Sequence, residues 1–457
     1  MNNLTGKTFS VTILGCRVNH YEAEAIASAL EARGAVFARG DAGTPPDIAI
    51  IVTCSVTSAA DAKTRKTIRG ARRLNPEAAI VACGCWAQSV SAGDAASSGA
   101  DIVIGSRLKG RIADELENWY ASGRQSRRSL TDIRTDVAKS RDWDTLSLDK
   151  TRILTRAFIK IQDGCDMRCG YCAVPFLRGG EASRDARAVL DEISRVAANG
   201  AKEVILTGVR LGGYQSGEVS LARLVGEISR VRGLRRLRLG SLEPFAVTDD
   251  LLRAARESEI FCPHLHLPIQ SGDDETLRAM RRGYGVSDFE RVVESARVYL
   301  GENAHISTDL IVGFPGETEK MFENSLMAVE RLKFGKVHVF PYSPRAGTAA
   351  SKSERLPAGT VKRRTALALA LSERMSAEYA SRFVARDCAV LAENGDGGVA
   401  SGHSEHYLKV YFKARKRVKG DEITLTPKIS VGSILLCEGV KPEEIADARR
   451  GDGETSG

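Results

Sequence analysis

Three cysteines lie close together near the middle of the chain, Cys165, Cys169 and Cys172, with the spacing C-x3-C-x2-C. Three thiolates on one tight loop can bind three irons of a 4Fe-4S cluster and leave the fourth iron open for a small molecule. Zinc is the main alternative, but a structural zinc site usually has a fourth Cys or His at short spacing, and none follows Cys172 nearby. The thiols are flanked by the charged residues Asp163, Asp166 and Arg168. We therefore expect a polar, exposed loop rather than inert core cysteines.

Three further cysteines each follow an apolar run in the first part of the chain. Cys16 ends TILGC, Cys54 ends IAIIVTC and Cys85 follows IVACG. If these runs are parallel strands, their carboxyl ends meet at one edge of an open α/β sheet, where ligands bind. The three thiols then form a second possible cluster site, although any one of them alone is more simply explained as a core residue. Cys83 lies close to Cys85, and strand alternation leaves only one of the two as a candidate ligand.

The composition of the chain limits its class. Its 457 residues are enough for roughly two to four domains. The chain has ten cysteines but neither a signal segment nor an apolar run long enough to span a bilayer, so we expect a cytoplasmic protein with reduced thiols. Cys262, Cys388 and Cys437 lie in apolar runs and are predicted to be core residues. The net charge of +8 suits a polyanionic partner such as RNA, although many basic proteins bind none.

The order of apolar and polar runs predicts three domains. Residues 1–140 alternate strands with helical patterns, which is typical of an open parallel α/β sheet. Residues 150–375 contain six strand candidates separated by helices, which favours a partial β/α barrel with its chemistry at the carboxyl ends of the strands. Residues 380–441 form short strands between Gly-rich or charged turns and predict a small antiparallel barrel. Residues 442–457 are expected to form a flexible tail.

The third domain contains a stretch, HYLKVYFKARKRVKG, in which cations alternate with aromatic residues. Its aromatic residues are Tyr407, Tyr411 and Phe412. Lysines and arginines can follow a phosphate backbone while aromatic rings stack on bases, which would suit single-stranded RNA. A solvated hairpin with its aromatic rings in the core is an equally good interpretation of the residues alone.

Longer stretches of the chain are similar to one known family. KIQDGCDMRCGYCAVPFLRGGEASRD resembles the radical S-adenosylmethionine (SAM) signature as it occurs in methylthiotransferases. LGCRVNHYEAEAI, TCSVTSAADAKTR, GCWAQ, LTGVRLGGY, LPIQSGDDETLRAMRRGY and TDLIVGFPGETE continue the resemblance in order along the chain. The resemblance covers the whole chain, and its last part would be the RNA-binding TRAM domain of that family.

The resemblance implies two 4Fe-4S clusters and SAM as cofactors. Cys165, Cys169 and Cys172 would bind the radical-generating cluster, and Cys16, Cys54 and Cys85 the auxiliary cluster. The family pattern G-C-x-A-Q falls on Gly84 to Gln88 and so selects Cys85 over Cys83. SAM would be cleaved to a radical at the first cluster, and a methylated sulfur would pass from the second cluster to a substrate carbon. The chain departs from the family pattern at Val52, where Asn is usual, and in the stretch 240–243.

Four residues at the carboxyl ends of predicted barrel strands are expected to contact SAM: Thr207, Gly208, Ser241 and Glu243. In many radical enzymes a GGE strand end holds the amino group of SAM, and Thr207-Gly208 takes the corresponding position here. Gly179-Gly180-Glu181 has the GGE sequence but follows the cysteine loop too closely. No residue beyond the cluster ligands is predicted to act in catalysis.

Within the family, LGCRVNHYEAEAI and HVFPYSPRAGT resemble the subfamily that adds a methylthio group to C2 of N6-threonylcarbamoyladenosine next to the anticodon of tRNA. The resemblance therefore implies tRNA as the substrate and a low-potential electron donor, such as flavodoxin or ferredoxin, as a partner. Rival subfamilies act on isopentenyladenosine in tRNA or on an aspartate of a ribosomal protein. An iron-sulfur protein that binds RNA without catalysis is the alternative of another class. The sequence does not predict the oligomeric state.

Overall fold

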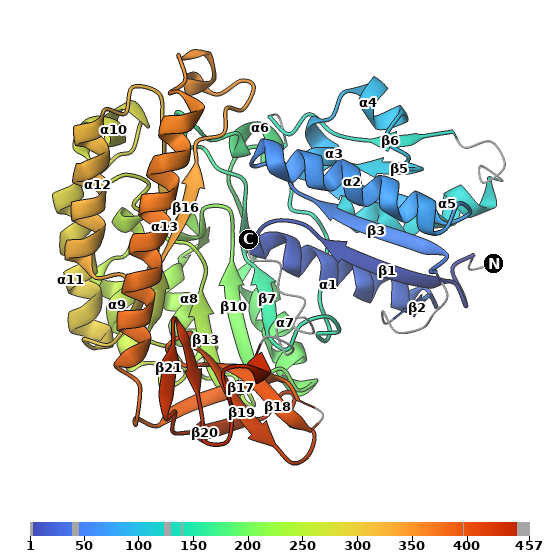
Figure 1. Ribbon diagram of the computed structural model, residues 1–457. Coiled ribbons are helices and arrows are strands. Elements are labelled where there is room, and N and C mark those ends of the chain that lie inside the picture. Colours follow the sequence, from blue (N-terminus) through green and yellow to red (C-terminus); the bar gives the residue numbers. More distant parts are fainter. Residues whose placement is uncertain (1–2, 39–44, 123–128, 139, 396, 446–457) are drawn as a thin grey trace.

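The computed structural model describes residues 3–38, 45–122, 129–138, 140–395 and 397–445. A parallel sheet near the N-terminus lies beside a second, curved parallel sheet, and a smaller sheet near the C-terminus lies at the foot of a long helix (Figure 1). The predicted α/β class with these three kinds of sheet is confirmed. None of the described helices is long and apolar enough to cross a membrane.

The N-terminal sheet is parallel throughout, in the order β2-β1-β3-β4-β5-β6. Its strands are β1 (Thr8–Ile13), β2 (Val36–Phe37), β3 (Ile48–Thr53), β4 (Ala79–Gly84), β5 (Ile102–Ile104) and β6 (Thr131–Ile133). The helices around it are α1 (Arg17–Ala32), α2 (Ser58–Leu74), α3 (Cys85–Ser89), α4 (Ala92–Ala96) and α5 (Ile112–Ala121). Helices α1 and α5 cover one face, and α2, α3 and α4 cover the other. Because both faces are covered, every residue of β3 and β4 is buried.

Six parallel strands in chain order form the curved central sheet. They are β7 (Ala157–Lys160), β10 (Glu203–Thr207), β13 (Arg236–Leu239), β14 (His264–His266), β15 (His305–Val312) and β16 (Lys336–Pro341). The first three and the last three pair in a ladder each, and single bridges, Leu237 to Phe261 and Ser241 to His266, join the two ladders. These six strands are the ones that the sequence predicts, and their arrangement is an incomplete barrel.

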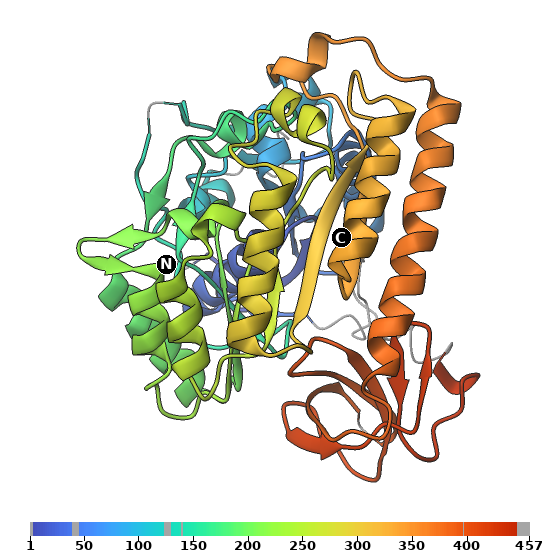
Figure 2. The same ribbon diagram turned by 90° about the vertical axis from the view of Figure 1, so that its left-hand side faces the viewer.

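Helices surround the outside of the curved sheet (Figure 2). The longer ones are α7 (Ala186–Ala198), α8 (Leu221–Ile228), α9 (Asp249–Glu257), α11 (Val286–Leu300), α12 (Glu319–Leu332) and α13 (Ala358–Ser381). Short elements include α6 (Val174–Arg178), α10 (Asp274–Ala279) and the antiparallel pairs β8 (Gln162–Asp163) with β9 (Ala182–Ser183) and β11 (Gln215–Ser216) with β12 (Val219–Ser220). Single 3-10 turns lie at Lys109–Arg111, Leu211–Gly213, Pro244–Ala246 and Ala349–Lys352.

The N-terminal sheet closes against the side of the barrel that β7 forms. Helix α1 packs on β7, and Tyr21 and Ile26 of α1 belong to the same apolar core as Ile159 and Val204 of the barrel. This shared core fixes the position of one sheet relative to the other. The boundary between residues 140 and 150 stays a prediction, because no break in the apolar core marks it.

The C-terminal sheet has the order β20-β17-β18-β19-β22-β21 and a core of its own. Its strands are β17 (Cys388–Asn394), β18 (Gly398–Ser404), β19 (Lys409–Ala414), β20 (Glu422–Leu425), β21 (Ile429–Val431) and β22 (Ile434–Leu436). All neighbours are antiparallel except β19 and β22, which are parallel. Arg236 and Arg238 of β13 donate to carbonyl groups of this sheet, at His403 (2.9 Å) and Ser404 (2.7 Å). Most of the predicted tail, residues 446–457, lies outside the described residues.

Candidate active site

The first group of cysteines lies on the loop that follows β7 and β8. Backbone hydrogen bonds hold this loop, because Cys165 N–H donates to the carbonyl of Gly179 (2.9 Å) and Cys172 N–H to that of Cys169 (3.1 Å). The guanidinium of Arg282 donates to Sγ of Cys169 at 3.4 Å. All three thiols are free and stand at the carboxyl end of a barrel strand, where the spacing predicts a cluster.

Burial affects the titration of these thiols. It raises the pKa of Cys165 to about 12 and that of Cys172 to about 11. Without a metal, both groups therefore keep their protons at neutral pH, and binding of a cluster must release them.

The predicted SAM contacts lie beside this loop, at the carboxyl ends of β10 and β13. Burial raises the pKa of Glu243, and its Oε2 atom has no hydrogen-bond partner among the described residues. A terminal nitrogen of Arg282 is likewise buried and unpartnered. Buried polar atoms without a partner are costly, so they fit a site that a polar small molecule such as SAM fills. Thr207 is buried, and a Cβ on Gly208 would lie 2.9 Å from Cβ of Gln162, so the strand end is tightly packed.

The discounted GGE sequence lies under the cysteine loop. Glu181 forms an ion pair with Arg210 (2.5 Å) and accepts from the backbone N–H of Asp166 (3.2 Å). Its carboxylate therefore already has partners within the protein.

The second group of cysteines gathers at the carboxyl edge of the N-terminal sheet. Cys16 precedes α1, Cys54 follows β3, and Cys85 follows β4 as the first residue of α3. Burial, together with the neighbouring Cys85 and Cys16, raises the pKa of Cys54 to about 12. A Cβ on Gly15, next to Cys16, would lie 2.8 Å from Sγ of Cys54. The topology thus brings together three thiols that are far apart in the sequence.

Cys83 points away from this edge. It lies in β4 on the face covered by α1 and α5, and it is completely buried in the same core as Val81. Its Sγ donates to the carbonyl of Ile51 at 3.8 Å. Cys85 instead belongs to a small apolar cluster with Leu177 and with Ala173, the residue that directly follows Cys172 of the first group. This geometry supports the choice of Cys85 over Cys83.

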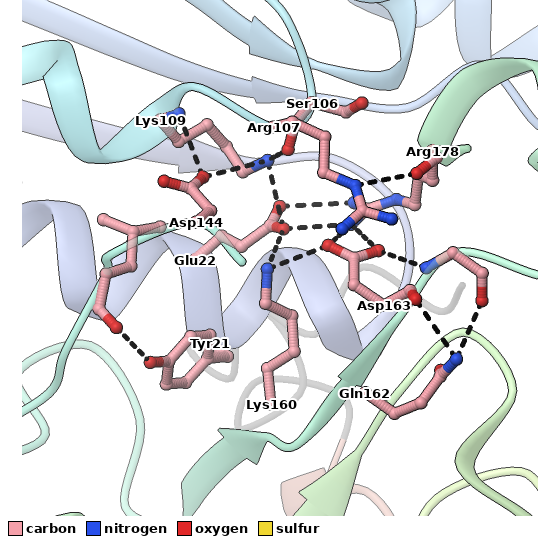
Figure 3. A network of polar contacts seen from close by, with 12 residues as sticks. Tyr21, Glu22, Ser106, Arg107, Lys109, Asp144, Lys160, Gln162, Asp163 and Arg178 are labelled. Atoms are coloured by element: carbon pink, nitrogen blue, oxygen red, sulfur yellow. Dashed lines mark hydrogen bonds and ion pairs between the residues drawn. The ribbon is translucent and has the colours of Figure 1, made fainter. Parts of the chain in front are cut away.

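A buried polar network lies beside the second group of cysteines, and it was not predicted from the sequence (Figure 3). Its centre is Arg178, at the end of α6, whose Nε donates to Sγ of Cys85 at 3.3 Å. Burial would raise the pKa of Glu22, but the charges of Arg178 and two lysines outweigh it and lower that pKa from 4.5 to about 2. Asp163, expected to be exposed, is buried in this network and forms an ion pair with Lys160 at 3.0 Å. Within the described ranges, no three His, Cys, Asp or Glu side chains lie close enough together to bind a single metal ion. The ligands of an iron-sulfur cluster can lie farther apart than this, because each ligand binds a different iron.

The aromatic residues of the basic stretch do not face solvent. Tyr411 and Phe412 are buried in the C-terminal sheet, and Tyr407 is stacked on His264, with the guanidinium of Arg238 at 5.0 Å from its ring. Of the two interpretations of this stretch, the structure therefore contradicts stacking of the rings on RNA bases and supports the hairpin with its aromatic rings in the core. The exposed cations of the stretch are Lys413, Arg415, Lys416, Arg417 and Lys419.

Comparisons with known proteins agree with this architecture. The family described as the radical SAM superfamily matches residues 159–329, and the uncharacterized protein family UPF0004 matches residues 8–105. The radical SAM methyltransferase TsrM from Kitasatospora setae, solved with tryptophan and a SAM analog, has a TM-score of 0.56 at 18% identity over 75% of each chain. That likeness shows the fold alone. The central part of the chain is a radical SAM domain, a class that binds a 4Fe-4S cluster and SAM.

Relatives that match nearly the whole chain show which radical SAM family the protein belongs to. The threonylcarbamoyladenosine tRNA methylthiotransferase MtaB of Bacillus subtilis is 34% identical, and the match covers 90% of this chain and 92% of the relative. The MtaB of Thermotoga maritima is 36% identical, and the match covers 97% of this chain and 100% of the relative. A tRNA-2-methylthio-N(6)-dimethylallyladenosine synthase of Endomicrobium trichonymphae is 31% identical, with 92% of this chain and 97% of the relative covered. The chain belongs to the radical SAM methylthiotransferase family.

Proposed function

We propose that the protein adds a methylthio group to C2 of N6-threonylcarbamoyladenosine next to the anticodon of tRNA. The observation that carries this proposal is the pair of cysteine groups at the carboxyl ends of two neighbouring parallel sheets. Methylthio transfer needs a radical generator and a sulfur donor within reach of one substrate. Cys85 of one group belongs to the same small apolar cluster as Ala173, next to Cys172 of the other, so both sites can serve one substrate.

Each group has a distinct role in this proposal. Cys165, Cys169 and Cys172 bind the cluster that, with SAM, supplies the substrate radical. Cys16, Cys54 and Cys85 bind the auxiliary cluster, which supplies the sulfur. The free thiols and the guanidinium beside each group fit such clusters, because cationic donors stabilise thiolate ligands.

Four side chains or backbone positions are proposed to hold SAM: Thr207, Gly208, Ser241 and Glu243. The buried Oε2 of Glu243 accepts a hydrogen bond from the amino group of SAM, which gives that atom the partner it lacks within the protein. A side chain at position 208 would clash with Gln162, so this strand end requires a glycine. A low-potential donor, flavodoxin or ferredoxin, supplies the electrons.

The choice of nucleoside follows from the relatives. Two relatives named for threonylcarbamoyladenosine match at 34% and 36% identity, and the matches cover 92% and 100% of their length. Dimethylallyladenosine synthases match at a similar identity, but those at 35% or 36% are covered over only 74% to 80% of their length. The exposed cations of the C-terminal sheet are proposed to bind the phosphates of tRNA without base stacking.

Mass spectrometry of tRNA nucleosides, with and without the gene, tests this function. Deletion should remove 2-methylthio-N6-threonylcarbamoyladenosine and let N6-threonylcarbamoyladenosine accumulate. Loss of the methylthio form of isopentenyladenosine instead would assign the other tRNA substrate. Unchanged tRNA nucleosides would contradict the proposal and direct the search to a ribosomal protein or to RNA binding without catalysis.

A further inference from the structure

The end of helix α6 lies between the two groups of cysteines. The side chain of Arg178 donates from Nε to Sγ of Cys85 at 3.3 Å. The carbonyl of the next residue, Gly179, accepts the backbone N–H of Cys165 at 2.9 Å. Two consecutive residues therefore contact one cysteine of each group.

The remaining donors of the Arg178 guanidinium are also used, and Figure 3 shows those that bind Glu22 and Asp163. They bind Glu22 at 2.9 and 3.2 Å, Asp163 at 3.2 Å and Asn19 at 3.0 Å. Glu22 and Asn19 belong to α1, the helix that begins directly after Cys16. Asp163 ends β8, directly before the loop that carries the first cysteine group. The guanidinium thus connects α1, β8 and the first residue of α3, and it is almost completely shielded from water, because Arg178 is 2% exposed.

The charges of the network do not cancel. Four buried cations, Lys109, Lys160, Arg107 and Arg178, surround three buried carboxylates, Glu22, Asp144 and Asp163. One positive charge is left over within this network. An unbalanced buried charge is strongly unfavourable, so the network is suited to an anion beside it. The ligand position of Cys85, at the Nε of Arg178, is where that anion would lie.

Glycines allow the backbone around Arg178 to pack closely against neighbouring segments. A Cβ on Gly164 would lie 1.9 Å from the carbonyl oxygen of Gly180. Gly179 has a φ of +74°, and its Cβ would lie 2.1 Å from the carbonyl oxygen of Val137. Arg107 donates to the carbonyls of Arg178 (2.9 Å) and Gly180 (2.6 Å). The backbone that presents Arg178 is therefore fixed from several sides.

We propose that Arg178 is a positioning residue that stabilises the reduced state of the auxiliary cluster and holds its ligand Cys85 against the loop of the first cluster. The inference rests on the proposed function, because it requires a cluster at Cys16, Cys54 and Cys85. A hydrogen bond and a positive charge on a thiolate ligand stabilise the extra negative charge of a reduced cluster and raise its reduction potential. Removal of both therefore lowers that potential.

The test is a redox titration followed by electron paramagnetic resonance. The background is the full-length triple variant Cys165→Ala/Cys169→Ala/Cys172→Ala, reconstituted with iron and sulfide, so that only the auxiliary cluster contributes. Arg178→Gln in this background should lower the midpoint potential and change the spectrum of the reduced cluster. Arg178→Lys keeps the charge but loses the planar fork of donors, so it should lower the potential by less. Arg364→Gln is the control, because Arg364 is equally buried but pairs with Glu317 at 2.7 Å, away from both groups.

The outcomes distinguish a failure of the role proposed for Arg178 from a failure of the proposed function. A background variant that binds no cluster would contradict the second cluster and hence the proposed function itself. An auxiliary cluster that loads fully in Arg178→Gln with an unchanged midpoint potential would overturn the role of Arg178 alone. If Arg178→Gln fails to load a cluster, Arg178→Lys decides: a lowered potential supports the inference, and an unchanged one overturns it.

Discussion

The two groups of cysteines occupy the same kind of place but have different surroundings. Both lie at the carboxyl end of a parallel sheet, and in each a guanidinium donates to one sulfur, Arg282 to Cys169 and Arg178 to Cys85. Around the first group, polar atoms of Arg282 and Glu243 are buried without partners. Around the second, every donor of Arg178 is used by the protein.

This difference separates a site with unpartnered polar groups from one whose hydrogen-bond donors already have partners within the protein. Unpartnered buried atoms favour binding of a ligand that supplies the missing hydrogen bonds, the role proposed for SAM at the first group. A saturated network instead favours a fixed geometry, which suits a sulfur donor that must face the first site.

The largest effect is expected from Cys169→Ala. Loss of one ligand of the first cluster should abolish reductive cleavage of SAM and, with it, all methylthio transfer. Formation of 5′-deoxyadenosine, measured by chromatography after anaerobic reduction, checks the first step. Cys437→Ala, a buried cysteine outside both groups, should keep wild-type cleavage. Cleavage by a fully folded Cys169→Ala variant would refute the assignment of the loop.

Cys85→Ala should separate the two reactions. Cleavage of SAM should persist, because the first cluster is intact, whereas the methylthio product should disappear. Cys83→Ala should keep both reactions and lose only about 1 kcal/mol of stability, because it removes one buried atom from the core. Cleavage is followed as 5′-deoxyadenosine and the product by mass spectrometry of tRNA. If Cys83→Ala loses the product and Cys85→Ala keeps it, the ligand assignment is wrong.

Glu22→Gln tests the saturated network through stability. The folded-state pKa of Glu22 is lowered to about 2, so its carboxylate stabilises the fold above the unfolded-state value near 4.5. The substitution leaves buried cations unpaired and should cost about 3–5 kcal/mol at pH 7. The difference from wild type should shrink as the pH falls from 4.5 towards 2. Thermal unfolding of the metal-free protein across this range measures it, and Glu319→Gln, an exposed carboxylate, is the control.

Glu243→Gln should have the smallest effect. Unlike Glu22→Gln, it should weaken SAM binding and not the stability of the fold. Because its Oε2 atom has no partner, the substitution should leave the stability of the metal-free protein unchanged or higher. It should weaken SAM binding by about tenfold to a hundredfold, the value of one charge-assisted hydrogen bond. Equilibrium binding of SAM to the reconstituted variant measures this. Lower stability together with unchanged SAM affinity would show that the two sites do not differ in the proposed way.

Local spacing explains why the first group can be recognised from the sequence. Cys165, Cys169 and Cys172 share one loop, so their proximity follows from the chain itself. The second group needs the order of strands, because β1, β3 and β4 are neighbours only if the sheet is parallel and open. The alternation of apolar runs with helical patterns is sufficient to predict that sheet and the six barrel strands.

Charged and aromatic residues were harder to predict because their partners are distant in the sequence. Asp163 and Arg178 flank a polar loop, and only the approach of α1 buries them together with Glu22. Tyr411 and Phe412 alternate with cations in a way that equally fits an RNA surface, and only the folded sheet decides that they face inward.

The most direct test of the account is a count of iron in three reconstituted proteins. They are the wild type, the variant with Cys165, Cys169 and Cys172 replaced by Ala, and the variant with Cys16, Cys54 and Cys85 replaced by Ala. The account predicts that each triple variant retains one 4Fe-4S cluster, half of the iron of the wild type. Full wild-type iron in the second variant would contradict it, because no cluster would then depend on the thiols of the N-terminal sheet.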